Sequence, residues 1–150
     1  MTRILIFYYS RTGNTEKMAK AVAEGLQGSG NAEVELNYYV DADDLAGFDA
    51  ILVGAPTFNK DMPLDTRKLF EQAEAKGVDL KGKIGGAFGS YGWSGEATKL
   101  VIDIMTNKFG MRVVEPPLMA KNTPDSKTLE SCREFGKRVS ETVNRNSNLS

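Results

Sequence analysis

Histidine is absent from this chain of 150 residues, and cysteine occurs once, at Cys132. Without histidine the sequence cannot form a Ser-His-Asp or Cys-His nucleophile system, and it lacks the commonest ligand of protein metal sites. A single cysteine excludes an internal disulfide and leaves too few thiolates for an iron–sulfur cluster held by cysteines. If the protein takes part in chemistry, we expect a bound cofactor to carry the reaction.

The chain also lacks long apolar runs and an excess of charge of either sign. No stretch approaches the roughly 18 unbroken apolar residues that a membrane helix needs. The N-terminus runs into "RILIFYY" without the pattern of a secretion signal, so we expect a cytoplasmic protein. A formal net charge of -1 argues against a nucleic-acid-binding surface, which normally shows a basic excess. This length predicts one domain, residues 1–150, with a substantial core.

Strand and helix patterns alternate along the sequence. Apolar runs predict strands over 4–9, 32–39, 50–55, 84–89 and 111–119. In the second of these, Val34, Leu36 and Tyr38 share one side, as in an edge strand. Apolar residues at helical spacing predict helices over 14–27, 64–76, 96–109 and 127–144, and residues 41–47 fit one short turn. This alternation predicts an α/β fold: a doubly wound five-stranded parallel sheet of order 2-1-3-4-5, with helices on both faces in three layers.

Three polar loops follow neighbouring strands of this predicted sheet. In the order 2-1-3-4-5 the chain reverses direction between strands 1 and 3, and the loops leaving their carboxyl ends open a crevice. Residues 10–15 follow strand 1, "PTFNKDMP" (56–63) follows strand 3, and "SYGWSGE" (90–96) follows strand 4. All three are rich in glycine, proline, hydroxyl or aromatic residues. We therefore expect them to meet in a binding site.

The first loop has the hydrogen-bond donors that a phosphate group needs. The N-terminus of the helix over 14–27 supplies unpaired amides and a partial positive charge, and Gly13 allows a close turn around an anion. The side-chain donors are Ser10, Thr12, Asn14 and Thr15. An alternative is a capped turn, in which one hydroxyl accepts from the third amide of the helix. The number of donors in this one loop favours the phosphate.

Several other phosphate-handling classes do not fit this loop. It lacks the Gly-Lys-Ser/Thr of a nucleoside triphosphate P-loop and the Gly-x-Gly-x-x-Gly of a dinucleotide site. A phosphatase would need a cysteine here, and the one cysteine lies far along the chain. A receiver domain would need clustered carboxylates, whereas strand 1 ends in Tyr8, Tyr9 and Ser10.

The second and third loops carry aromatic residues: Phe58 in one, Tyr91 and Trp93 in the other. A large ring exposed at a loop tip forgoes about 2–3 kcal/mol of burial, so it usually has a partner. A flat heteroaromatic ring between the two loops would cover these side chains. For Phe58, an equally good interpretation is that it folds back over the end of the sheet. For Trp93, between Gly92 and Gly95, stacking on a ligand ring is favoured. A phosphate joined to a flat ring by a sugar-like chain describes a mononucleotide such as FMN.

These motifs resemble those of a known family. Ser-x-Thr-Gly-Asn-Thr after strand 1, "FDAILVGAPTF" around strand 3 and "GSYGWSGEA" after strand 4 are similar to flavodoxin, and the resemblance spans essentially the whole chain. "SYGWSG" is similar in particular to the flavodoxin-like module of the A-type (diiron) flavoproteins. Residues 111–124 show no long insertion, as in short-chain flavodoxins.

The resemblance implies non-covalent FMN and assigns a role to each loop. In the phosphate loop it points to Ser10, Arg11, Thr12, Gly13, Asn14 and Thr15. In the first ring-contacting loop it points to Pro56, Thr57, Phe58 and Asn59, and in the second to Ser90, Tyr91, Gly92, Trp93 and Gly95. No metal ligands and no catalytic side chains are implied.

The implied function is electron transfer between redox partner proteins that dock near the exposed flavin edge, by a monomer or weak dimer rather than an enzyme in its own right. Alternatives are an FMN-dependent NAD(P)H reductase of quinones or similar acceptors, and an interaction module without flavin. Two features depart from the family. Asn59-Lys60 stands where a glycine often lies beside the flavin, and the chain is nearly neutral where flavodoxins are acidic. Asp41, Asp43 and Asp44 are the candidate acidic docking patch, and Asp61 and Glu96 the candidate carboxylates near the ring.

Overall fold

The structure, a computed structural model, describes residues 2–10, 13–28, 32–58, 60–92 and 95–148. Its elements in chain order are β1 (Thr2–Tyr8), α1 (Asn14–Gln27), β2 (Ala32–Asn37), the 3-10 helix η1 (Ala42–Gly47), β3 (Ala50–Gly54), α2 (Leu64–Ala75), β4 (Ile84–Tyr91), α3 (Glu96–Asn107), β5 (Arg112–Val113), β6 (Leu118–Lys121) and α4 (Ser126–Asn148). The predicted alternation of strands and helices is confirmed. Most predicted bounds agree with these to within two residues.

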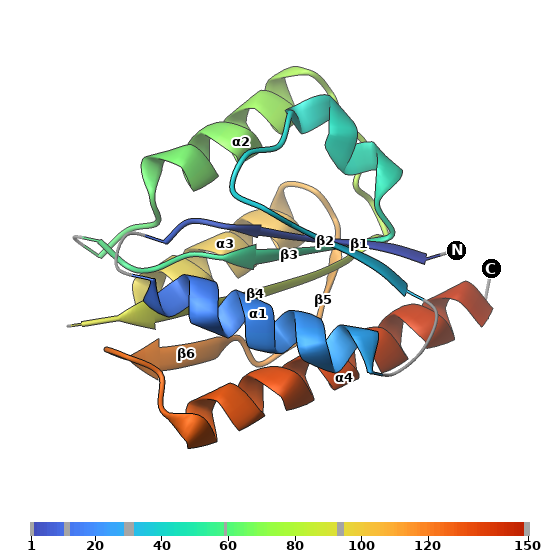
Figure 1. Cartoon of the computed structure of the whole chain (residues 1–150). Coiled ribbons are helices and arrows are strands. Elements are labelled where there is room, and N and C mark those ends of the chain that lie inside the picture. Colours follow the sequence, from blue (N-terminus) through green and yellow to red (C-terminus); the bar gives the residue numbers. More distant parts are fainter. Residues whose placement is uncertain (1, 11–12, 29–31, 59, 93–94, 149–150) are drawn as a thin grey trace.

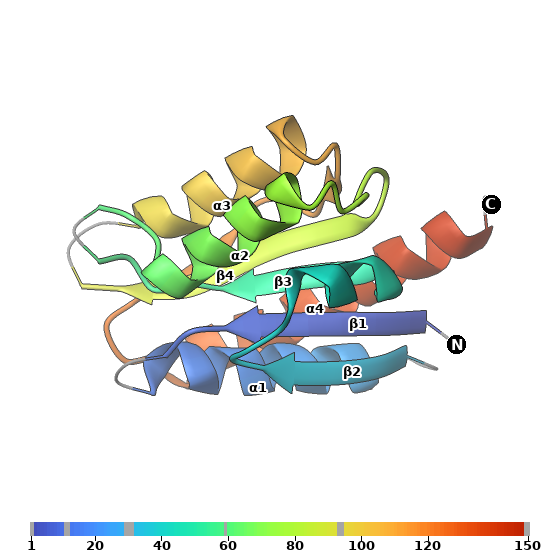
Figure 2. The same ribbon diagram turned by 90° about the horizontal axis from the view of Figure 1, so that it is seen from above.

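The strands pair in parallel in the order β2-β1-β3-β4-β5, which confirms the predicted topology. Figures 1 and 2 show the sheet between two helical layers, with α1 and α4 on one face and α2, η1 and α3 on the other. Strand β1 contributes side chains to the hydrophobic core on each face of the sheet. Its Leu5 and Phe7 belong to the core beneath α2 and α3, and Ile4 and Ile6 to the core above α1 and α4. The continuous apolar run of this strand therefore reflects burial on both faces.

The last predicted strand, 111–119, is wrong as a single element. The structure divides it into β5, which pairs with the start of β4, and β6, which pairs with the end of β4 from Phe88 to Tyr91. Pro116 and Pro117 lie between the two. Proline has no N–H to give to a ladder, so the pairing stops there and resumes at Leu118. The break keeps both ends of β4 covered, including the end that carries the third loop.

The predicted apolar side of the second strand is also wrong at one position. Strand β2 ends at Asn37, and the side chain of Tyr38 is 75% exposed just beyond it. Tyr39 is 73% exposed beside it. The chain has left the sheet at this point and turns towards η1, so the two-residue alternation no longer sets which side is buried.

Cys132 is fully buried on α4, in the core that α4 shares with α1. Burial raises the pKa of its thiol to about 12. The thiolate is therefore nearly absent at neutral pH, and Cys132 acts as a small apolar core residue. In the described part of the chain, no helix is both long and apolar enough to cross a membrane.

Helices α1 and α4 approach each other so closely that glycine is required at their crossing. A methyl group on Gly136 would overlap the carbonyl oxygen of Val22, and one on Gly25 would overlap the carbonyl oxygen of Arg133. Both obstacles are backbone atoms, so no side-chain rotation can relieve them. The two glycines therefore set the distance between these helices, and with it the position of α1 under the sheet.

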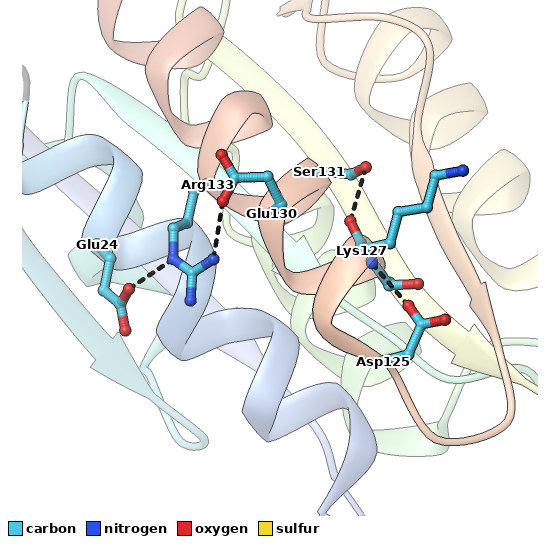
Figure 3. A network of polar contacts seen from close by, with 7 residues as sticks. Glu24, Asp125, Lys127, Glu130, Ser131 and Arg133 are labelled. Carbon is cyan, nitrogen blue, oxygen red and sulfur yellow. Dashed lines mark hydrogen bonds and ion pairs between the residues drawn. The ribbon is translucent and has the colours of Figure 1, made fainter.

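Charged side chains reinforce this crossing at the surface. Arg133 on α4 donates through Nε to Glu24 on α1 at 2.8 Å and through a terminal nitrogen to Glu130 at 3.1 Å (Figure 3). The start of α4 is capped by Asp125, whose carboxylate accepts from the amide of Thr128 at 2.8 Å. This hydrogen bond holds the pKa of Asp125 below its ordinary value. Exposed ion pairs contribute little energy, so the glycine contact determines the geometry.

Replacing Gly136 with alanine tests this contact. Alanine gains about 1 kcal/mol of helix propensity over glycine, but overlap with the backbone of α1 costs about 3 kcal/mol or more, so a net loss of unfolding free energy is expected. Lys137→Ala, at the exposed neighbouring position, is the matched control and should change stability by no more than about 0.5 kcal/mol. Urea unfolding of both variants measures the difference. Equal stability of Gly136→Ala and the original protein would contradict the close crossing.

Candidate functional site

A cleft lies at the carboxyl edge of the sheet, where the loops after β1, β3 and β4 come together. Its lining consists of Ser10, Asn14, Thr15, Pro56, Thr57, Phe58, Ser90, Tyr91, Gly92 and Asn122. The first nine of these are among the residues that the sequence predicted. Gly13 and Gly95 lie next to lining residues without being part of the lining, and Arg11, Thr12, Asn59 and Trp93 lie outside the described residues. The predicted meeting of the three loops is therefore found, and a fourth segment joins it.

The loop after β1 turns into α1 through Gly13. This residue is the N-cap of the helix and has φ 89°, a left-handed conformation that side chains with a Cβ rarely adopt. The hydroxyl oxygen of Ser10 accepts from the amides of Gly13 at 3.1 Å and Glu16 at 3.2 Å. Ser10 thus makes the cap of the alternative interpretation. Its own proton stays free to donate, because a hydroxyl oxygen can accept and donate at once.

The first two amides of α1, those of Asn14 and Thr15, have no acceptor within the helix. Both residues line the cleft. The positive end of the helix macrodipole therefore faces the same space as these amides, the Ser10 hydroxyl and the Asn14 side chain. Small neutral donors with a helix N-terminus are the donor set that holds a phosphate dianion.

Hydrogen bonds join the three loops at the base of the cleft. The hydroxyls of Thr15 and Ser90 lie 3.0 Å apart, and both residues are almost fully buried. The amide of Thr57 donates to the carbonyl of Ser90 at 3.1 Å. The hydroxyl of Thr57 in turn accepts from the amide of Ala97 at 3.0 Å and so caps α3. Thr15, predicted only as a ligand donor, therefore also links the phosphate loop to the end of β4.

Two aromatic side chains from different loops line the cleft. Phe58 and Tyr91 are both half-buried there. The ring of Tyr9 meets that of Phe58 edge to face, with centroids 6.0 Å apart at 85°. Phe58 thus has an aromatic neighbour in Tyr9 and also borders the cleft, so the two interpretations offered for it are compatible. Trp93, the other predicted stacking residue, remains a prediction.

The loop that carries Phe58 is a tight hairpin. The amides of Phe58 and Asp61 each donate to the carbonyl of the other at 2.9 Å. Lys60, within this turn, has φ 63°, in the left-handed region. The family resemblance places Asn59-Lys60 where a glycine often lies beside the flavin, and glycine is the residue that adopts positive φ most readily. Among the described residues of the turn it is Lys60 that adopts this conformation. Asp61, a candidate ring carboxylate, is engaged by Arg67 and by the amide of Met62.

Gly95, predicted to contact the ligand, has a different role. A methyl group at this position would lie 2.6 Å from the sulfur of Met119 and 3.6 Å from a ring carbon of Tyr91. Its φ is -111°, so no left-handed conformation calls for glycine here; a larger residue would require the flexible Met119 side chain to move. The thioether of Met119, on β6, packs directly on Gly95. This contact supports the third loop from behind the cleft.

Asn122 lines the cleft and was not found from the sequence. It directly follows β6, has φ 60°, and its amide donates to the carbonyl of Tyr91 at 2.7 Å. Its side chain offers both a donor and an acceptor to a ligand. The available signal was its place after the last strand, since residues just beyond parallel strands gather at one edge.

The lining is almost free of ionisable groups. Among its described residues the lining holds no carboxylate, lysine, arginine or cysteine. Among the described residues of the chain, no three His, Cys, Asp or Glu side chains gather as a metal site. The described lining can therefore orient a ligand, hold an anion and cover a flat ring. The residues present in the cleft fit FMN: the hydrogen-bond donors at the start of α1 suit its phosphate, and the rings of Phe58 and Tyr91 suit its flavin.

Comparison with known proteins places the chain in a family. The model of the family described as Flavodoxin matches residues 6–136. The chain therefore belongs to the flavodoxin family, whose members are FMN-binding electron-transfer proteins that interact with redox partners. Proteins with this strand order, flavodoxins among them, are already known to bind ligands at the crevice between strands 1 and 3. The predicted family, cofactor and class of function are confirmed at this level.

Individual relatives are of two lengths. The chain is 36% identical over 146 residues to the type A flavoprotein fprA of Rhodobacter capsulatus, with 92% of this chain and 32% of that protein covered. It is 34% identical over 135 residues to the flavodoxin of Clostridium beijerinckii, with 89% and 96% covered. A solved flavodoxin from the domain Archaea has a TM-score of 0.85 at 36% identity, covering 95% of this chain and 99% of that one. The chain spans about a third of the type A flavoprotein and nearly all of the flavodoxins.

The buried hydroxyl pair gives a prediction about stability. Thr15→Val keeps the shape of the side chain but leaves the Ser90 hydroxyl without its partner, which costs about 1–2 kcal/mol of unfolding free energy. Adding Ser90→Ala removes the stranded hydroxyl, and the double variant should recover part of the loss. Ser131→Ala, which removes an exposed hydroxyl that donates to the carbonyl of Lys127, is the control and should be nearly neutral. Denaturant unfolding without cofactor measures the stability of Thr15→Val, Ser90→Ala, the double variant and Ser131→Ala. Strictly additive losses would contradict a coupled pair.

Proposed function

We propose that this chain binds FMN non-covalently in the cleft and carries electrons between protein partners. The observation that carries the proposal is the convergence of the α1 N-terminus, the hydroxyls of Ser10 and Thr15, and the rings of Phe58 and Tyr91 on one cleft. Each of these features has a counterpart in one part of a flavin mononucleotide. The family relationship independently supports the same cofactor.

The proposal assigns separate tasks to the loops. The amides of Asn14 and Thr15 and the hydroxyl of Ser10 hold the phosphate, and Thr12 adds a donor that the sequence predicts. Phe58 and Tyr91 cover the flat ring and exclude water from it, with Trp93 as a further predicted cover. Pro56, Thr57 and Asn122 shape the space between. When bound, the flavin supplies the redox chemistry; the residues position it and set its surroundings.

A direct binding experiment tests the cofactor. Fluorescence titration of the apoprotein with FMN and with riboflavin should show FMN binding far more tightly, because riboflavin lacks the phosphate. The variant Thr12→Ala/Thr15→Ala should lose at least about tenfold more affinity for FMN than for riboflavin, since each hydrogen bond to a charged group contributes about 1.5–3 kcal/mol.

Equal losses for the two ligands would mean that the loop does not hold the phosphate. No binding of FMN by the unsubstituted protein would remove the proposal altogether. Rapid oxidation of free NAD(P)H by the loaded protein would favour the reductase over the electron carrier.

The surface beside the cleft supports docking of a protein partner. Tyr38, Tyr39 and Leu64 are the three most exposed large apolar residues of the described chain. A groove between the end of β2 and α2 contains both tyrosines together with Asp65 and Lys68 of α2. Asp41 accepts from the hydroxyl of Tyr39 at 3.0 Å, and Asp43 and Asp44 follow on η1. We infer that a partner with a basic rim and an apolar centre docks here, next to the loop that carries Phe58.

Electron transfer to a basic c-type cytochrome can measure this docking. In stopped-flow mixing of reduced, FMN-loaded protein with ferricytochrome c, Tyr38→Ser/Leu64→Ser should lower the second-order rate constant by about fivefold or more, as central apolar contacts do in other interfaces. Leu100→Ser removes an exposed leucine from α3 and should leave the rate within about twofold. Asp44→Asn should weaken the dependence of the rate on salt. An unchanged rate constant in Tyr38→Ser/Leu64→Ser, together with an unchanged salt dependence in Asp44→Asn, would mean that the partner docks elsewhere.

A further inference from the structure

The methionines of the described chain differ sharply in exposure. Met18 and Met105 are fully buried, Met62 and Met111 are 5% exposed, and Met119 is 38% exposed. Oxidation of a methionine sulfur to the sulfoxide depends on access of the oxidant to that sulfur. Among these five residues, a peroxide in solution therefore meets Met119 first. The remaining sulfur of the described chain, in Cys132, is buried and protonated.

Met119 also lies where a change would reach the cleft. It pairs with Gly89 in the ladder between β6 and β4, two residues before Tyr91. Its sulfur packs on Gly95, at the end of the third loop, and the ring of Tyr91 lies against the same glycine. Three residues further along the chain, Asn122 holds the carbonyl of Tyr91 through its amide. Met119 is not among the described lining residues of the cleft, and it contacts the third loop at Gly95.

We propose that Met119 is an oxidation site that controls the described part of the third loop: conversion of its thioether to the sulfoxide by hydrogen peroxide loosens Tyr91, Gly92 and Gly95 and weakens cofactor binding. In this step the sulfur attacks one peroxide oxygen and the O–O bond breaks. A sulfur–oxygen bond forms, the sulfur loses two electrons, and the other oxygen leaves as water after taking up the remaining proton. Peroxide is the oxidant and is reduced to water.

The physical effect follows from the packing on Gly95. A thioether is apolar and polarisable, and it fits against the Cα of a glycine and the edge of a ring. A sulfoxide is polar and chiral, and it seeks hydrogen bonds with water. Because the sulfur lies close to Gly95 and Met119 is 38% exposed, a sulfoxide oxygen that turns towards water draws the side chain away from the loop. Tyr91 then loses support on the face that positions it in the cleft.

The part of this inference that concerns FMN rests on the proposed function, whereas the site of oxidation and its effect on the loop do not. The experiment therefore has two independent measurements. Purified FMN-loaded and cofactor-free protein is treated with graded hydrogen peroxide, and peptide mass mapping gives the extent of oxidation at each methionine. Amide hydrogen exchange at Tyr91, Gly92 and Gly95 measures the loop, and fluorescence titration measures affinity for FMN.

Met119 should be oxidised well before Met18, Met62, Met105 and Met111. Affinity for FMN should fall at least about fivefold in step with oxidation at this residue, and exchange in the third loop should quicken. Met119→Leu, which conserves volume, should bind FMN normally and resist peroxide in both measurements. Met119→Gln, polar and of similar length, should show the weakened affinity and the faster exchange without peroxide.

Oxidation of another described methionine at the same rate would overturn the assignment of the site. Unchanged amide exchange and unchanged affinity for FMN after full oxidation of Met119 would overturn its control of the loop. The same conclusion would follow if peroxide changed exchange and affinity in Met119→Leu as much as in the original protein. If untreated protein does not bind FMN, the proposed function fails. In that case mass mapping still shows whether Met119 is the methionine that is oxidised first, and amide exchange still shows whether its oxidation loosens the third loop.

Discussion

The pairing of β1 between β2 and β3 is the constraint on which the rest of this structure depends. Because β1 has a parallel neighbour on each side, the connections that follow β1 and β3 leave towards opposite faces of the sheet. The loop after β1 enters α1 on one face, and the loop after β3 enters α2 on the other. A crevice between these two loops forms whatever the sequence of the loops. It follows from the order of the strands, and the residues of the loops decide only what can fill it.

Hydrogen bonds and close backbone contacts turn this opening into a defined site. The hydroxyl pair of Thr15 and Ser90 joins the first and third loops, and the amide of Thr57 joins the second loop to the third. At the same level, a methyl group on Gly89 would overlap the carbonyl oxygen of Ala55, so the ends of β3 and β4 lie at their closest approach. Since the donors are tied to one another below the cleft, their free hydrogen-bonding groups keep fixed directions above it. A site of this kind is preorganised for its ligand.

The residues that line the cleft are suited to binding a cofactor, and the bound cofactor would supply the redox chemistry. Neutral donors at a helix N-terminus stabilise an anion without a lysine, and their strength does not change with pH. The described lining holds no carboxylate or lysine beside the rings, so solvation, stacking and more distant charge would set the potential of a bound flavin. The family relationship gives this arrangement its role in electron transfer, while the full length of the type A flavoprotein includes much that this chain does not.

The sequence by itself determined the layer architecture, the strand order, and nine of the ten described residues that line the cleft. These follow from local patterns: continuous apolar runs for strands covered on both faces, helical spacing between them, and polar residues just beyond strand ends. The tertiary structure alone decided the division of the last strand at Pro116 and Pro117, the entry of Asn122 into the cleft, and the supporting role of Gly95 against Met119. It also decided that Thr15 pairs with Ser90, 75 residues away in the chain. Such contacts join segments that are distant in the sequence. A local sequence pattern therefore cannot predict which side chain packs against a given glycine or which hydroxyl bonds to a given buried hydroxyl.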